Sequence, residues 1–324
     1  MRNFLFRIVF FVVPIIVIGG LGDWYISKTL RKSNSYAEGE YSTWNAILEG
    51  NINSDIVVYG SSRAWVHVSP AILKDSLKMS VYNFGIDGHN FWLQYLRHDL
   101  YLQHNKKPKV IIQTLDFSTL MKQKTLYNPD QFLPYMLWNK KIKDATLSYE
   151  GYKFFDYEIP LVRYYGKLNA FKEVKRLIRK PDANLPERIR GYKGMDRQWN
   201  NDFQNAKLKL KKINIELDSK SVALFEKYLQ ECQSKHIKMI FVYTPEYIEG
   251  QNLIVNKKDI ISLYRQFSIK YNIPFYDYSN DALSMNQDNF YNALHLNKVG
   301  SEKFSRKLAA TLKVENPTLF PPKK

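Results

Sequence analysis

The sequence has almost no cysteine, since Cys232 is the only one in 324 residues. A single thiol excludes both an intrachain disulfide and a thiolate metal cluster. The histidines also lack metal-binding spacing, because none lies in a His-x-x-x-His pattern or at a carboxylate spacing suited to a metal. We therefore expect no metal and no cofactor. Lone histidines are usually structural, so we interpret most of them as surface or packed side chains, namely His67, His98, His104 and His236.

Signatures of nucleic-acid binding are absent as well. The formal net charge is +17, which attracts phosphate, carboxylate or anionic lipid. Yet the chain has no zinc-finger spacing, no RNP-like aromatic signature and no polybasic tail, so we expect no nucleic-acid partner. The charge is concentrated in one region: residues 140–212 carry 19 Lys and Arg against 9 Asp and Glu.

A long apolar run occurs at the N-terminus. Residues 8–22 contain no charge, Arg2 and Arg7 precede them, and Trp24 and Tyr25 follow. An apolar segment of about 20 residues spans a bilayer, and interfacial arginines and aromatics anchor its ends. We therefore expect residues 1–26 to be a membrane anchor, with the bulk of the chain on the extracytoplasmic side.

The same run has a second interpretation. Gly20 and Gly22 are small residues that could precede a cut at Asp23, as in a cleavable signal peptide. Three cations just beyond the segment also run against the positive-inside rule: Lys28, Arg31 and Lys32.

Beyond the apolar run, short β-branched segments alternate with longer helical patterns. This alternation predicts an α/β fold with a five-stranded, doubly wound parallel sheet. We expect strands at residues 56–59, 81–84, 110–115, 239–243 and 275–278. We expect helices at residues 70–77, 91–103, 221–235, 257–271 and 299–312. In the last helix a four-residue stripe should pack on the sheet: Phe304, Leu308 and Leu312.

The order of these expected segments divides the chain into five parts, of which the anchor at residues 1–26 is the first. A polar stalk at 27–53 leads into the first part of the α/β domain, 54–117, and the second part is 218–324. Residues 118–217 read as a basic insertion or cap. Its aromatics could hold sugar rings or acidic polymers, or form the core of the insertion: Tyr152, Phe154, Phe155, Tyr157, Tyr164 and Tyr165.

A serine pair follows the first expected strand, where Gly60 leads into Ser61 and Ser62. Sites in open α/β sheets form at the carboxyl ends of the strands, and a serine becomes a nucleophile once a base takes its proton. Alternatively, either serine caps the following helix. Arg63, next in sequence, could bind a substrate carboxylate or phosphate, or form a local salt bridge.

Two further segments could complete a site. Gly85 and Gly88 follow the second strand, and their backbone N–H groups could face an oxyanion. His89 comes next and could contact substrate. His295 lies beyond the fifth strand, on the side where Ser62 emerges.

Together these segments resemble the SGNH (GDSL-like) hydrolase superfamily, in particular its membrane-bound branch with the D-alanyl transfer proteins of teichoic acid and the alginate O-acetyltransferases. The resemblance implies a flavodoxin-like fold, Ser62 as nucleophile, Gly85 in the oxyanion hole and His295 as base. His295, Leu296, Asn297 and Gly300 match the His-Leu-Asn-x-x-Gly pattern of the family. The matching regions are 56–115 and 239–312, so the insertion is not covered.

Two positions depart from the family pattern. Asp116 stands where the family places an oxyanion-hole asparagine, and an ionised carboxylate accepts hydrogen bonds rather than donating them. Either Asp116 faces elsewhere or the site lacks one donor. Asn292 replaces the acidic residue three positions before His295, so it could orient the imidazole but not stabilise imidazolium by charge. A backbone carbonyl or Asp288 could substitute, and a Ser–His dyad remains an option.

From these residues we expect an O-acyl esterase or acyltransferase that acts on a cell-envelope glycan through Ser62 and His295. Its partners would be the membrane, the glycan, an acyl donor and, by the same resemblance, a membrane-embedded acyl-transfer protein. The alternative is a non-catalytic relative that binds or helps assemble an envelope polysaccharide, an interpretation that Asn292 and Asp116 favour.

Overall fold

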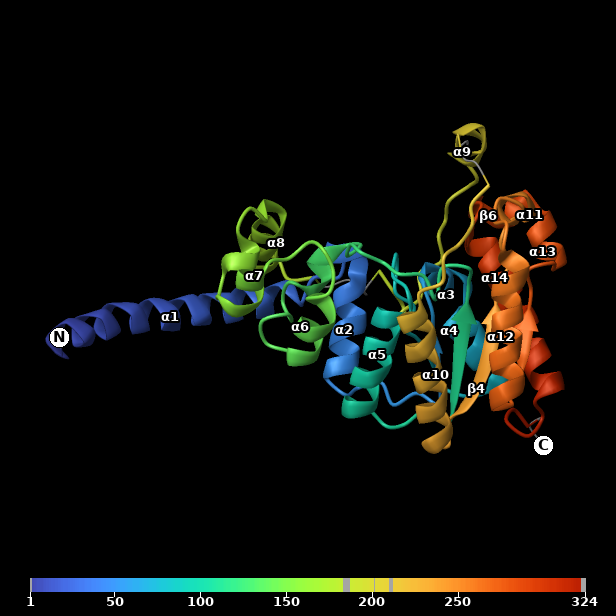
Figure 1. Cartoon of the computed structure of the whole chain (residues 1–324), viewed down its shortest axis with the longest axis horizontal. Helices are drawn as coiled ribbons and strands as arrows, with labels where there is room; N and C mark the ends of the chain where they lie inside the picture. Colours follow the sequence, from blue (N-terminus) through green and yellow to red (C-terminus); the bar gives the residue numbers. More distant parts are fainter. Residues whose placement is uncertain (1, 183–186, 201, 210–211, 322–324) are drawn as a thin grey trace. The chain divides into compact units, whose positions relative to one another are not determined.

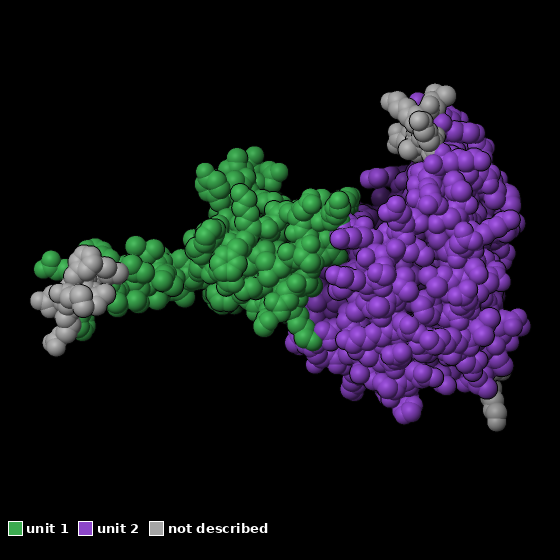
Figure 2. All heavy atoms as spheres, in the orientation of Figure 1, with its two compact units in different colours: residues 1–45, 124–188 green, residues 46–123, 189–324 purple. Residues whose placement is uncertain are grey.

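A computed structural model describes residues 2–182, 187–200, 202–209 and 212–321. The chain divides into two compact units, coloured separately in Figure 2. Unit 1 comprises residues 1–45 and 124–188, and unit 2 comprises residues 46–123 and 189–324.

Unit 2 contains a five-stranded parallel sheet, as the sequence predicted (Figure 1). The strand order is β2-β1-β3-β4-β5, which is the flavodoxin-like doubly wound order. Two expected strands, 81–84 and 275–278, are each one residue shorter in the structure. The strands are β1 (Ile56–Tyr59), β2 (Val81–Asn83), β3 (Val110–Leu115), β4 (Lys238–Tyr243) and β5 (Phe275–Asp277).

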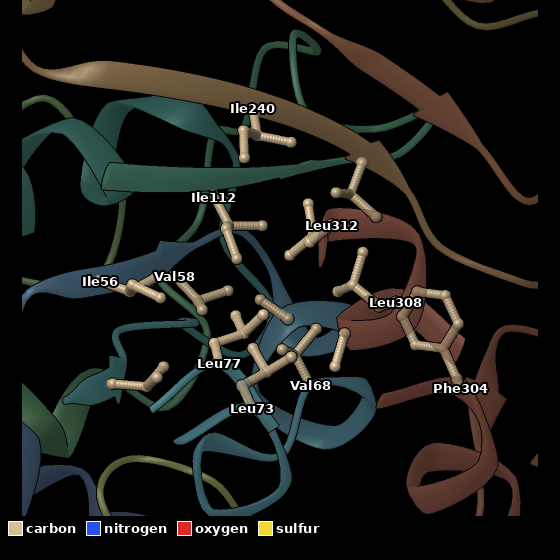
Figure 3. Packing of buried hydrophobic residues seen from close by; sticks show 14 of the residues in the cluster. Ile56, Val58, Val68, Leu73, Leu77, Ile112, Ile240, Phe304, Leu308 and Leu312 are labelled. Carbon is tan, nitrogen blue, oxygen red and sulfur yellow. The ribbon is translucent and has the colours of Figure 1, made fainter. Parts of the chain in front are cut away.

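Helices cover both faces of the sheet. On one face, α3 (Ser62–His67), α4 (Pro70–Leu77) and α14 (Lys298–Glu315) enclose an aliphatic core. The expected stripe of Phe304, Leu308 and Leu312 is confirmed, because all three side chains are fully buried in this core (Figure 3). The other face packs against α5 (Phe91–His104), α10 (Ser219–Ser234) and α12 (Lys257–Tyr271).

Several short elements of unit 2 were not expected. The most important is a hairpin of β6 (Phe290–Asn292) and β7 (His295–Leu296), which pair antiparallel. Strands of three and two residues carry too little alternation to be recognised in a sequence. The others are α9 (Asp202–Lys209), α11 (Ile248–Gln251), α13 (Ala282–Met285) and η4 (Gln287–Asn289).

Unit 1 is built around the long helix α1 (Arg2–Leu30). Its segment Val9–Leu30 is long and apolar enough to cross a membrane, a property that signal sequences share. The remaining elements that begin in unit 1 are η1 (Tyr36–Gly39), α2 (Glu40–Leu48), η2 (Pro129–Phe132), α6 (Lys140–Thr146), α7 (Phe154–Glu158), η3 (Val162–Tyr164) and α8 (Leu168–Arg179).

The unit boundaries differ from those expected. The proposed stalk, 27–53, is folded, because Tyr41 and Trp44 on α2 are fully buried in unit 1. The proposed insertion, 118–217, is divided: residues 124–188 pack with the N-terminal residues, whereas 189–217 belong to unit 2. The polar composition of residues 27–53 did not predict these contacts, because burial of two large aromatic side chains is enough to hold a short helix in place.

The aromatics of the insertion have two different environments. Tyr157 and Tyr164 are buried and contribute to the core of unit 1. Phe154, Phe155 and Tyr165 are exposed, with Tyr165 at 91%. Packing in the core of the insertion therefore explains Tyr157 and Tyr164 but not the three exposed aromatics.

Candidate active site

Ser62 lies at the first position of α3, directly after the carboxyl end of β1. Gly60 makes the turn possible, because its φ is 153° and a Cβ there would overlap the Thr114 side chain. Ser61 is the N-cap, and its Oγ accepts from the Arg63 N–H at 3.3 Å. The capping interpretation therefore describes Ser61, and the Ser62 hydroxyl is left for another partner.

That partner is His295, whose Nε2 lies 2.8 Å from Ser62 Oγ. The two residues are 233 positions apart in sequence. The structure brings them together because β7, which begins at His295, packs against α3, which begins at Ser62. Tyr291 stacks on the imidazole, with ring centroids 5.4 Å apart and planes within 9°.

Asn292 fixes the tautomer of this imidazole. Its Oδ1 accepts from the backbone N–H groups of Leu294 and His295, both at 3.0 Å, which identifies that atom as the oxygen. The same Oδ1 lies 2.9 Å from His295 Nδ1. Since an amide oxygen only accepts, Nδ1 carries the proton, and Nε2 presents its lone pair to Ser62.

The surroundings favour the neutral form of His295. Burial of the ring and, second, the positive charge of Arg63 lower its pKa to about 4, although the Asp116 carboxylate opposes them. The ring is therefore unprotonated at neutral pH. The ring can accept the Ser62 proton directly. However, Asn292 is neutral and has no negative charge with which to stabilise the imidazolium that results.

His67 and Thr244 help to hold His295 in position through hydrogen bonds. His67 is fully buried, its Nδ1 lies 3.0 Å from Thr244 Oγ1, and its Nε2 accepts the Leu296 N–H at 2.9 Å. This bond holds β7, the strand that begins at His295. Burial lowers the pKa of His67 well below its usual value, so the ring stays a neutral acceptor. We had interpreted His67 as a packed imidazole, and no sequence spacing distinguishes it from the others.

Arg63 is held in a buried ion pair. Its Nη1 lies 3.1 Å from Glu246 Oε2, and both side chains are almost fully buried. The guanidinium also donates to Thr244 through Nε, at 3.1 Å, and through Nη2 to the Thr244 carbonyl. The ion pair is not the local one that was the alternative for Arg63, because Glu246 is 183 positions away in sequence, and it is a partner that the sequence did not reveal. Arg63 also lines the cavity beside Ser62.

Asp116 is an acceptor and supplies no hydrogen bond to an oxyanion. Its Oδ2 accepts from Ser61 Oγ at 2.5 Å, and its Oδ1 accepts from the backbone N–H and hydroxyl of Ser118 at 2.9 and 2.7 Å. The carboxylate thus ties the loop after β3 to the N-terminus of α3.

The segment that follows β2 contains two glycines with different roles. The Gly85 N–H donates to Asn83 Oδ1 at 2.9 Å, and a Cβ on Gly85 would overlap the backbone N of Trp65. Gly85 is therefore a packing position whose amide is engaged, which does not fit the expected oxyanion role. Gly88 instead lines the cavity beside Ser62 and has a φ of 65°.

A cavity of about 260 Å³ opens over Ser62 and His295. His89, 3% exposed, lies in its wall. Phe117, Met121 and Leu294 make part of the lining apolar, and Lys122 adds a cation. Among residues 2–182, 187–200, 202–209 and 212–321, no group of three His, Cys, Asp or Glu side chains could hold a metal ion.

Comparison with known proteins gives structural likenesses only. No protein-family model matches the chain, and no curated protein sequence matches it. A solved acetyl xylan esterase, AlAXEase, is 14% identical, with a TM-score of 0.40 over 81% of this chain and 99% of the other. A protein assigned to the G-D-S-L lipolytic family from Desulfitobacterium hafniense is 13% identical, with a TM-score of 0.38 over 79% and 98%.

Proposed function

We propose that this chain is a membrane-anchored, SGNH-like O-acyl esterase or acyltransferase that acts on a cell-envelope glycan. The observation that carries the proposal is the 2.8 Å approach of Ser62 Oγ to a His295 Nε2 whose tautomer Asn292 fixes. A serine, a base within hydrogen-bond reach and a group that orients the base make an activated nucleophile. They lie beside a cavity at the carboxyl ends of the strands, where α/β sheets place their sites.

In the proposed reaction, His295 Nε2 takes the proton of Ser62 Oγ as that oxygen attacks the acyl carbonyl. The oxyanion accepts from the Ser62 N–H, which has no intrahelical partner at the first position of α3, and from the Gly88 N–H. Protonated His295 then gives its proton to the leaving alcohol. Water, or a sugar hydroxyl, attacks the acyl-Ser62 ester, returning a proton to His295 and then to Ser62.

The cavity suits a short acyl group. Its volume of about 260 Å³ is below the usual range for ligand sites, which is about 300–1,000 Å³. The glycan acceptor, the acyl donor and a membrane-embedded acyl-transfer partner follow from the family resemblance and are part of the proposal.

The proposed anchor is α1, with the bulk of the chain extracytoplasmic. Its support is the continuity of α1 through Gly22 and Asp23, the cleavage point in the alternative interpretation, into the core of unit 1. Both carboxylate oxygens of Asp23 lie 2.6 Å from the Arg163 guanidinium, and both side chains are fully buried. Cleavage before Asp23 would separate the Asp23–Arg163 pair from the apolar part of α1.

The second candidate is a non-catalytic protein that binds or helps assemble an envelope polysaccharide. Asn292 favours it, because without a carboxylate the imidazolium of the transition state lacks a charge partner. Asp116 favours it too, since the loop after β3 presents an acceptor where a donor would stabilise the oxyanion.

Hydrolysis of a chromogenic acetyl ester by the parent and by Ser62→Ala separates the two candidates. Removing the nucleophile should abolish the enzyme-dependent rate. The matched control is Ser61→Ala, which removes the neighbouring hydroxyl that faces Asp116 and should retain measurable turnover. A parent rate equal to that of Ser62→Ala would support the non-catalytic candidate.

A further inference from the structure

Unit 1 exposes large apolar side chains close to the helix that we propose as the anchor. Phe154 and Phe155 on α7, Ile159 just after it, and Leu168 and Phe171 on α8 are all exposed, with Leu168 at 70%. Monomeric soluble proteins rarely expose apolar side chains in such groups, and those that do use them for interactions. We name this set the α7–α8 surface.

The α7–α8 surface is continuous with α1. A Cβ built on Gly19 would lie 3.8 Å from Pro160 Cβ, and one built on Gly22 would lie 3.8 Å from Leu161 Cδ1. The segment that joins α7 to η3 therefore packs directly on α1 near the end of its apolar run. The buried Asp23–Arg163 pair fastens the same part of α1 to η3.

The position along α1 sets the depth of this contact in a bilayer. From Arg7 to Trp24 the helix rises by about 26 Å, at about 1.5 Å per residue. The hydrocarbon core of a bilayer is about 30 Å thick. If Arg7 lies at one interface, Gly22 and Trp24 lie at the other, and so does the chain that packs against them.

The outer face of α8 has the composition of a helix that lies in an interface. Ala170, Val174 and Leu177 form its buried stripe toward unit 1. The opposite face combines apolar and cationic side chains, all exposed: Leu168, Phe171, Lys172, Lys175, Ile178 and Arg179. Apolar side chains that enter the acyl boundary, beside lysines and arginines that contact anionic headgroups, are the pattern of interfacial helices.

We infer that the α7–α8 surface binds the headgroup region of the bilayer that α1 crosses, with a preference for anionic lipid. The surface is thus a second membrane contact, which would hold unit 1 against the bilayer. This inference rests on the membrane anchor of the proposed function. Continuity with α1 and the exposed cations favour lipid over a protein partner.

Site-specific fluorescence tests the inference in the full chain, reconstituted into nanodiscs of phosphatidylcholine and phosphatidylglycerol. Cys232 is buried, and burial raises the pKa of its thiol, so an environment-sensitive dye will react with an introduced cysteine instead. Dyes attached through Phe155→Cys and Leu168→Cys should shift to the blue and lose most of their fluorescence to headgroup-labelled quencher lipids. The matched control is Lys32→Cys, an exposed position in unit 1 two residues beyond Leu30, the last residue of α1, which lies about 12 Å farther along the helix axis than Gly22.

Each outcome has a defined meaning. Dyes at positions 155 and 168 that resemble the one at 32 would overturn the inference and point to a protein partner. A dye attached through Ile16→Cys tests the anchor separately, because it should respond to quenchers on the acyl chains. If acyl-chain quenchers do not affect the dye at position 16, the result contradicts the proposed membrane anchor and not the lipid contact of the α7–α8 surface. Combined Lys172→Gln, Lys175→Gln and Arg179→Gln should reduce the quenching at position 168 in anionic nanodiscs, and unchanged quenching would contradict the lipid preference.

Discussion

Asn292 Oδ1 lies 2.9 Å from His295 Nδ1, so a neutral amide occupies the position from which a carboxylate would stabilise imidazolium. The hydrogen-bonding geometry is complete, and only the charge is missing. Asn292→Asp should therefore raise the turnover of acetyl esters by about tenfold or more, given that the reverse exchange in serine proteases costs about ten thousand-fold.

The matched control is Asn286→Asp, which adds the same charge at a helix-capping position next to α13. Steady-state kinetics on the three proteins measure the effect. Equal kcat values for the parent and Asn292→Asp would contradict the inference that a missing negative charge beside His295 limits turnover.

The low pKa of His295 predicts an unusual pH profile. Catalysis needs the neutral imidazole, so activity is present above the pKa and is lost as the pH falls through it. Because that pKa is about 4, kcat/KM should remain level through pH 6.5, the ordinary histidine value, and fall only near pH 4. In Asn292→Asp the added negative charge should move the acid limb to higher pH. An acid limb near pH 6.5 in the parent would show that His295 is not shielded as the structure indicates.

Arg63 should matter for stability. Arg63→Met leaves buried Glu246 with Lys257, at 3.2 Å, as its ionic partner among the described residues. Breaking one side of a buried pair costs about 3–5 kcal/mol of unfolding free energy. Urea denaturation in detergent measures this loss. Arg306→Met is the comparison, because it removes one partner of a largely exposed pair worth about 0.2–1 kcal/mol. Equal stabilities for the two variants would contradict the buried network.

Asp23 should hold unit 1 together. Asp23→Ala removes the acceptor of the Arg163 guanidinium and of the Leu161 N–H, which donates at 2.8 Å. Limited proteolysis should therefore cut residues 124–188 much faster in this variant. Asp144→Ala, which removes an exposed partner of Lys140 in the same unit, should leave the cutting rate unchanged. Protection of the segment in Asp23→Ala would show that α1 is not part of the core of unit 1.

The sheet was predictable because its strands are short, apolar and separated by helices with clear stripes. Val110–Leu115 and α12, Lys257–Tyr271, have the expected bounds, since burial on both faces and helical periodicity are local properties of the chain. Ser62 and His295 could be selected by their places after strands. Their approach to 2.8 Å is a tertiary fact that no local pattern contains.

Most of the features that the sequence did not predict depend on contacts between residues far apart in the chain. Gly85 and Gly88 look alike in sequence, and only the position of Asn83 shows which amide is engaged. Glu246 was not recognised, because nothing local links it to Arg63, 183 residues away. Residues 27–45 looked like a stalk, since their burial requires residues from 124–188.

Chemical reactivity of Ser62 tests the central claim most directly. A fluorophosphonate probe phosphonylates a serine hydroxyl when a neighbouring base takes its proton, whether or not the natural substrate is known. Mass spectrometry of peptides from the labelled full chain should place the adduct on Ser62, with none in a His295→Ala variant that keeps its fold. An unlabelled parent, or an adduct on a different residue, would contradict the account.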